Sequence, residues 1–136
     1  MSVALGIIGV ALYAAAIAGG LYFRLQTARF LAKHATIADA AGLEEFKNLA
    51  RRNMKAVYPF VAAIFLGMAL SAQLIIHDPV LGFATFLLLN ILVVWSGLSL
   101  RKVENRAREL ACPDPALAAT YQRIAQSWLS DSWPRF

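Results

Sequence analysis

The sequence lacks charge in three long stretches, and this uneven distribution excludes most soluble folds. Only 15% of its 136 residues are charged, while 60% are hydrophobic. Residues 3–23, 56–76 and 80–100 contain no Asp, Glu, Lys or Arg. Each run is about as long as the 20-residue helix that crosses a hydrocarbon core. The sequence therefore predicts an all-α polytopic membrane protein, a single membrane domain with transmembrane helices at these three ranges.

Residues that commonly carry catalysis or bind metals are also scarce. Cys112 is the single cysteine, and the two histidines, His34 and His77, are far apart in the sequence, so no zinc-binding set can be assembled. The sequence contains no HExxH, CxxC, Walker A, GxGxxG or nucleophile-elbow motif. No carboxylate lies in the apolar runs, which excludes a proton relay of paired acids. We therefore predict no catalytic, metal-binding or cofactor-binding residue.

Basic residues are absent from one side of the predicted membrane. Of the thirteen Lys and Arg residues, seven lie between the first and second runs and six follow the third. The N-terminus and the hairpin at residues 77–79 carry none. The positive-inside rule then predicts an inner or plasma membrane protein with its N-terminus outside and its C-terminus in the cytoplasm. This topology accounts for the net charge of +5 without nucleic acid, and it predicts contact with anionic membrane lipids.

Two amphipathic helices are expected on the cytoplasmic side. In residues 43–54, apolar side chains recur at helical spacing, which is typical of a helix near the membrane surface. Pro59 then predicts either a new helix start or a bend. Asp114 as N-cap and Pro115 as first helical residue predict a helix over residues 114–130. Its apolar stripe and the aromatic residue after it predict a tail that lies in the interface or docks on a partner: Leu117, Tyr121, Ile124, Trp128 and Trp133.

Small and polar residues mark the expected helix contacts inside the membrane. Small side chains recur every four residues at Ala11, Ala15 and Gly19, and again at Ala63, Gly67 and Ser71, with Gly9, Ala16 and Gly20 beside the first set. Such spacing lets helix backbones approach closely, either within one subunit or between subunits. Tyr13 and Asn90 lie near the middle of their runs. Because lipid offers no hydrogen bonds, we expect both to turn inward and find partners.

The stretch RRNMKAVYPF, residues 51–60, resembles the start of the second membrane helix in the membrane-associated proteins of eicosanoid and glutathione metabolism (the MAPEG family). The matching positions are Arg52, Asn53, Met54, Pro59 and Phe60. The resemblance implies a homotrimeric membrane enzyme that handles lipophilic substrates with glutathione, which Arg52 and Asn53 would contact. The family pattern also includes a glutamate after the Arg-Asn pair and an arginine in the third membrane helix. In this sequence no glutamate lies between Asn53 and Pro59, and the third run has no arginine.

These patterns favour one class of function over another. The first interpretation is a small non-catalytic integral membrane protein, a subunit or scaffold that packs on other membrane subunits or on itself. In this interpretation residues 51–60 anchor a helix where it enters the membrane. The alternative is the MAPEG-like enzyme.

Overall fold

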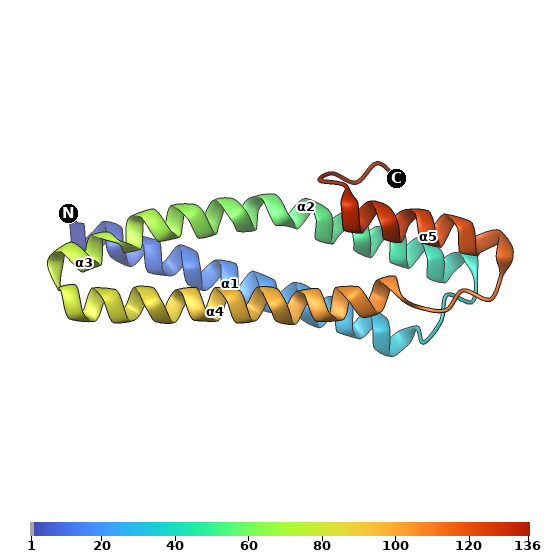
Figure 1. Ribbon diagram of the computed structural model, residues 1–136, viewed down its shortest axis with the longest axis horizontal. Helices are drawn as coiled ribbons and strands as arrows, with labels where there is room; N and C mark the ends of the chain where they lie inside the picture. Colours follow the sequence, from blue (N-terminus) through green and yellow to red (C-terminus); the bar gives the residue numbers. More distant parts are fainter. Residues whose placement is uncertain (1) are drawn as a thin grey trace. The chain divides into compact units, whose positions relative to one another are not determined.

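The computed structural model describes residues 2–136, which form five α-helices (Figure 1). The helices are α1 (Ser2–Lys33), α2 (Ala40–Ser71), α3 (Gln73–His77), α4 (Pro79–Arg108) and α5 (Pro115–Ser130). No strand forms within residues 2–136, where an isolated parallel bridge pairs Thr36 with Ala111. The predicted all-α fold class is thus confirmed.

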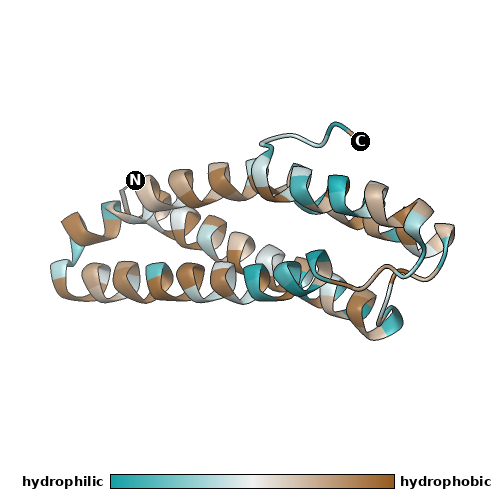
Figure 2. Cartoon of the chain, turned by 45° about the vertical axis from the view of Figure 1, so that its right-hand side comes forward, coloured by the Kyte–Doolittle hydropathy of each residue, from teal (hydrophilic) through white to brown (hydrophobic). Residues whose placement is uncertain are grey.

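Three helical stretches are long and apolar enough to cross a membrane. They are Val3–Lys33, Ala40–His77 and Pro79–Arg108. Figure 2 shows hydrophobic residues along much of α1, α2 and α4, with hydrophilic residues gathered toward one part of each helix. The three apolar runs of the sequence therefore lie in three different helical stretches.

The chain divides into two compact units. The apolar unit contains the described residues up to Tyr22 together with Tyr58–Leu100, and the basic unit contains Phe23–Val57 together with Arg101–Phe136. All thirteen Lys and Arg residues fall within the basic unit. The division in packing therefore coincides with the division in charge.

In the apolar unit, parts of α1, α2 and α4 run side by side, and α3 leads from α2 to α4 (Figure 1). The structure ends α2 at Ser71, although the second apolar run continues to Ile76. The amide of Ile75 bonds to the carbonyl of Ala72 three residues back, which marks the tighter turn between α2 and α3. Asp78 then starts α4, because its side chain accepts a hydrogen bond from the amide of Leu81 at 3.0 Å.

The basic unit has an aromatic and aliphatic core. The first part of α2 contributes Phe46, Leu49 and Met54, and α5 covers them with its own apolar stripe. Sequence periodicity predicts a separate helix over residues 43–54, but the structure joins this segment to the apolar run in one α2. Pro59 lies inside that helix. Of the two alternatives expected from Pro59, a new helix start does not occur, because α2 runs through the position as one helix.

Candidate functional site

A close backbone contact in the apolar unit lies between Gly9 on α1 and the part of α2 that contains Gly67 and Ser71. A Cβ atom on Gly9 would lie 2.3 Å from the amide nitrogen of Ser71 and 2.8 Å from the carbonyl oxygen of Gly67. A Cβ atom on Gly67 would lie 3.0 Å from the Gly9 carbonyl oxygen. Because side chains cannot fit there, the two backbones approach as small residues in membrane helices allow. Gly67 and Ser71 of the predicted set are therefore at a helix contact, and Gly9 is their counterpart.

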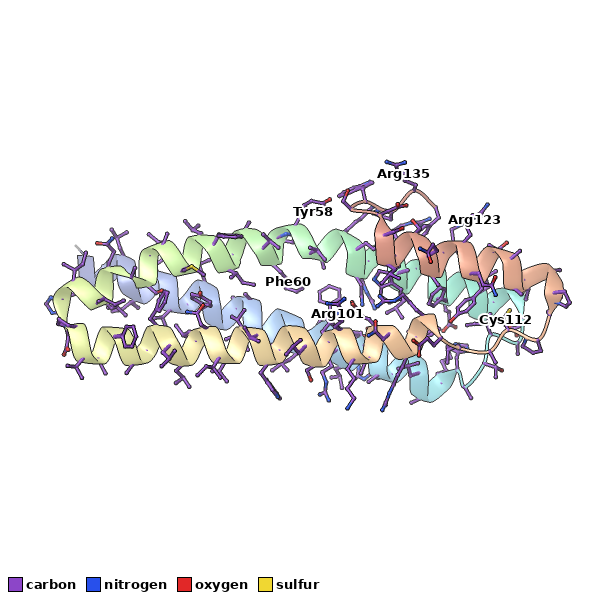
Figure 3. All side chains as sticks on the ribbon, in the orientation of Figure 1. Tyr58, Phe60, Arg101, Cys112, Arg123 and Arg135 are labelled. Carbon is purple, nitrogen blue, oxygen red and sulfur yellow. The ribbon has the colours of Figure 1, made fainter. Side chains whose placement is uncertain are left out.

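The other predicted packing residues have different positions. Gly19 faces Phe60, since a Cβ atom there would lie 2.3 Å from the ring, and Figure 3 shows Phe60 pointing inward from α2 while Tyr58 points away. Ala63 is half-buried. Ala11 and Ala15 are exposed, so the structure does not bring them to a contact within the chain.

The two polar residues of the apolar runs meet each other. The Tyr13 hydroxyl donates a hydrogen bond to Oδ1 of Asn90 at 3.2 Å, and Nδ2 of Asn90 donates to the carbonyl of Phe86 at 2.8 Å. Tyr13 is completely buried. This pair links α1 to α4 and satisfies the amide within the unit, which suits a structural role.

The apolar stripe of α5 packs on its own chain. Tyr121, Ile124 and Trp128 are buried in the core of the basic unit, where the ring of Phe46 lies 4.7 Å from Tyr121 and 5.8 Å from Trp128 between centroids. The tail was expected to lie in the interface or dock on a partner, but these three side chains are already enclosed by α2 and its neighbours. Of the other predicted tail residues, Leu117 is half-buried, and Trp133 is half-exposed with the Lys55 ammonium 5.6 Å from its ring.

Tyr121 also fixes the connection between α4 and α5. Its hydroxyl donates to the carbonyl of Ala107 at 2.7 Å and accepts from the amide of Leu110 at 2.8 Å. Burial raises the pKa of the Tyr121 phenol to about 12. The phenol therefore stays neutral and keeps both hydrogen bonds over the physiological range.

A buried polar cluster lies in the basic unit where α1, α2 and α4 meet. Nδ2 of Asn53 donates to the hydroxyl of Thr27 at 3.1 Å and to the carboxylate of Glu104 at 3.0 Å. The Thr27 hydroxyl donates in turn to the carbonyl of Phe23 at 2.8 Å. Asn53 is only 4% exposed, and its Oδ1 has no hydrogen-bond partner among the described residues. Each of the three helices contributes one side chain to this cluster.

The sequence interpretation named Asn53 only through the family resemblance and assigned no role in this cluster to Thr27 or Glu104. A signal was present, because Phe46, Ala50 and Asn53 are spaced four and three residues apart and share one helix face. A polar residue on an apolar face must find a partner when that face is buried. The partners on α1 and α4 are far away in the sequence, so spacing alone does not identify them.

The polar side chains described above suit hydrogen bonding between helices more than a chemical reaction. Within residues 2–136, no group of three His, Cys, Asp or Glu side chains could hold a metal ion. No protein-family model, curated protein or solved structure matches this chain. The resemblance of residues 51–60 to the MAPEG family therefore stays a prediction.

Proposed function

We propose that the chain is a small, non-catalytic integral membrane protein that works as a subunit or scaffold of a membrane assembly. Its three apolar helical stretches cross the inner or plasma membrane with the N-terminus outside. The basic unit lies on the cytoplasmic side, because that orientation puts every Lys and Arg inside. Support for insertion comes from the surface of the apolar unit, where Phe65 is 67% exposed and Leu98 is 63% exposed. Apolar surface of this extent on a soluble monomer would be unusual.

One observation supports an assembly role in particular. Gly9, Tyr13, Ala16 and Gly20 pack inside the chain, while a second small-residue face of α1 is exposed. This face consists of Ala11, Ala14, Ala15 and Ala18, which follow the i, i+3, i+4, i+7 spacing of a helix stripe. Close packing of small residues drives helix association in lipid. The exposed alanine face is therefore the surface on which another membrane helix packs.

The experiment compares assembly in two leucine variants. The wild-type protein is extracted in mild detergent and sized by native mass spectrometry with any co-purifying protein. Ala11→Leu with Ala15→Leu should dissociate the assembly while the chain keeps its thermal stability, because both positions are exposed. Ala84→Leu, at an exposed position on α4, is the matched control and should leave assembly intact. A wild-type chain that is monomeric and free of partners would contradict the proposal.

The MAPEG-like enzyme is the alternative, and one observation favours it. The family pattern has a glutamate after the Arg-Asn pair, and here Nδ2 of Asn53 donates a hydrogen bond to the carboxylate of Glu104 on α4 instead. In this alternative, Arg52 and Asn53 contact glutathione in a homotrimer. Calorimetric titration with glutathione distinguishes the two functions. Saturable binding that Arg52→Ala abolishes would favour the enzyme over the scaffold.

A further inference from the structure

A groove of about 380 Å³ lies between α1 and α2 in the basic unit. Its polar lining includes five hydrogen-bond donors, the cationic Arg29, Lys33 and Arg52 and the carboxamides Gln26 and Asn48, together with one carboxylate, Glu45. All five can donate hydrogen bonds, and the three cations donate only. None of these residues belongs to the Asn53 cluster or to the helix contacts of the apolar unit.

Helix periodicity creates this concentration of donors. Gln26, Arg29 and Lys33 are spaced three and four residues apart on α1, so they share one face. Asn48 and Arg52 are spaced four residues apart on α2 and share another. Both faces open onto the same groove.

The floor of the groove is apolar and rigid. Phe30 is 8% exposed and Leu49 is 4% exposed, and both belong to the core of the basic unit. Because Phe30 and Leu49 are packed in this core, they fix the backbone of α1 and of α2 beneath the groove. The backbone positions of the donor residues are therefore fixed, while the polar ends of their long side chains can adjust to a ligand.

The charge in the groove is incompletely balanced. Glu45 is its carboxylate, and its two oxygens are taken by Nζ of Lys33 at 2.9 Å and by Nε2 of His34 at 2.8 Å. Arg29 and Arg52 form no ion pair with any carboxylate among the described residues. The Arg52 guanidinium lies 5.8 Å from the ring centroid of Phe23, a cation–π contact that leaves its donors available. Two guanidinium groups therefore line one groove without an ion pair of their own.

We propose that this groove binds the phosphate group of an anionic phospholipid. Guanidinium groups donate paired hydrogen bonds to phosphate oxygens, and basic pockets between membrane helices on the cytoplasmic side bind anionic headgroups. The inference rests on the proposed membrane insertion. Arg29 follows Phe23, the end of the first apolar run, by six residues or about 9 Å of helix. Arg52 precedes Ala56 by four residues or about 6 Å.

These helix lengths match the headgroup region. A bilayer is about 40–45 Å thick in total around a hydrocarbon core of about 30 Å, which leaves about 5–8 Å for the polar layer on each side. Arg52 lies within that layer and Arg29 at its outer edge. A lipid headgroup can reach both guanidinium groups. The same phosphate chemistry would also suit a soluble phosphate compound, so the experiment must separate the two sources.

The test titrates delipidated full-length protein in detergent with phosphatidylglycerol, phosphatidylcholine or inorganic phosphate, and counts bound molecules by native mass spectrometry. We expect one phosphatidylglycerol to bind more tightly than phosphatidylcholine. The double variant Arg29→Gln with Arg52→Gln should weaken this binding about thirtyfold, since each cation near a headgroup contributes about fivefold. The control double variant, Lys102→Gln with Arg106→Gln, has the same charge change on exposed residues of α4 and should change binding less than twofold.

Each outcome bears on the proposal. Equal weakening by both double variants would mean that general charge attracts the lipid, and it would overturn the groove. Saturable binding of inorganic phosphate that the groove variant abolishes, without a preference for phosphatidylglycerol, would overturn the lipid as the source. Thermal unfolding checks that both variants stay folded. Carbonate extraction of cell membranes tests insertion separately, because a chain released by carbonate contradicts the proposed function whatever the groove binds.

Discussion

Removal of one hydroxyl, in Tyr121→Phe, should weaken the packing of α5 on the rest of the basic unit. The variant keeps the aromatic ring and its contact with Phe46 at 4.7 Å. It loses the hydrogen bond to the carbonyl of Ala107 and the one from the amide of Leu110. The perturbation therefore isolates hydrogen bonding from apolar packing.

The magnitude follows from the burial of the two groups left behind. Ala107 is completely buried, and an unsatisfied buried carbonyl costs about 1–3 kcal/mol. Leu110 is half-buried, and the net loss of the hydrogen bond at its amide is about 0.5–1.5 kcal/mol. Together these two losses should destabilise the docked α5 by about 1.5–4.5 kcal/mol.

Hydrogen exchange measured by mass spectrometry gives the most direct assay. If α5 opens locally, the backbone amides of α5 should exchange about 10 to 2000 times faster in Tyr121→Phe, which is the same free energy expressed as a ratio. Ser130→Ala is the control, because its exposed hydroxyl bonds only to the carbonyl of Gln126 and should change exchange less than threefold. Unchanged protection of α5 in Tyr121→Phe would refute the view that these two bonds hold the helix in place.

Other perturbations test other contacts. Gly9→Ala should destabilise the chain by about 1–3 kcal/mol in detergent thermal unfolding, because its Cβ meets the backbone of α2, while Gly97→Ala, with nothing within 4 Å, should be neutral. Asn90→Leu should cost only about 0.6 kcal/mol in the same assay, the average for a membrane hydrogen bond. Burial raises the pKa of Tyr121 to about 12 from an ordinary value near 10, so the unfolded phenol ionises first as pH rises. The midpoint temperature of thermal unfolding, followed by circular dichroism, should therefore decrease as the pH is raised from about 10 to about 12. Tyr121→Phe should lack the part of this decrease that Tyr121 causes.

Features carried by consecutive residues were predictable from the sequence. The three uncharged runs predicted three long apolar helices, because a run of that length is a property of one segment alone. Asp114 and Pro115 predicted the start of α5, and the structure has Asp114 as N-cap with its side chain 2.9 Å from the amide of Ala116. Local geometry decides such features, so distant residues do not alter them.

Features that depend on which helix faces meet were less predictable. Small residues cover two faces of α1, one with Gly9 and Gly20 and the other with Ala11 and Ala15. Both faces satisfy the spacing for close packing, and only the first meets another helix of the same chain. Which face packs depends on the residues of the opposite helix. Here that residue is Gly67, whose carbonyl oxygen would lie 2.8 Å from a Cβ atom on Gly9. A pattern on one helix cannot supply that information.

The tail shows why an amphipathic stripe should first be compared with other stripes of its own chain. The stripe of α5 alone predicts contact with the membrane interface or with a partner, and the periodicity of residues 43–54 alone predicts a separate surface helix. Both α5 and residues 43–54 have an apolar face that is stabilised by burial. Because the two segments belong to one chain, each meets the other at an effective concentration of about the millimolar range. Phe46 and Trp128 accordingly bury each other within the basic unit. The surfaces proposed above to bind other molecules are instead the exposed alanine face of α1 and the cationic groove between α1 and α2. The first suits an apolar helix and the second an anionic headgroup, so a membrane can supply partners for both.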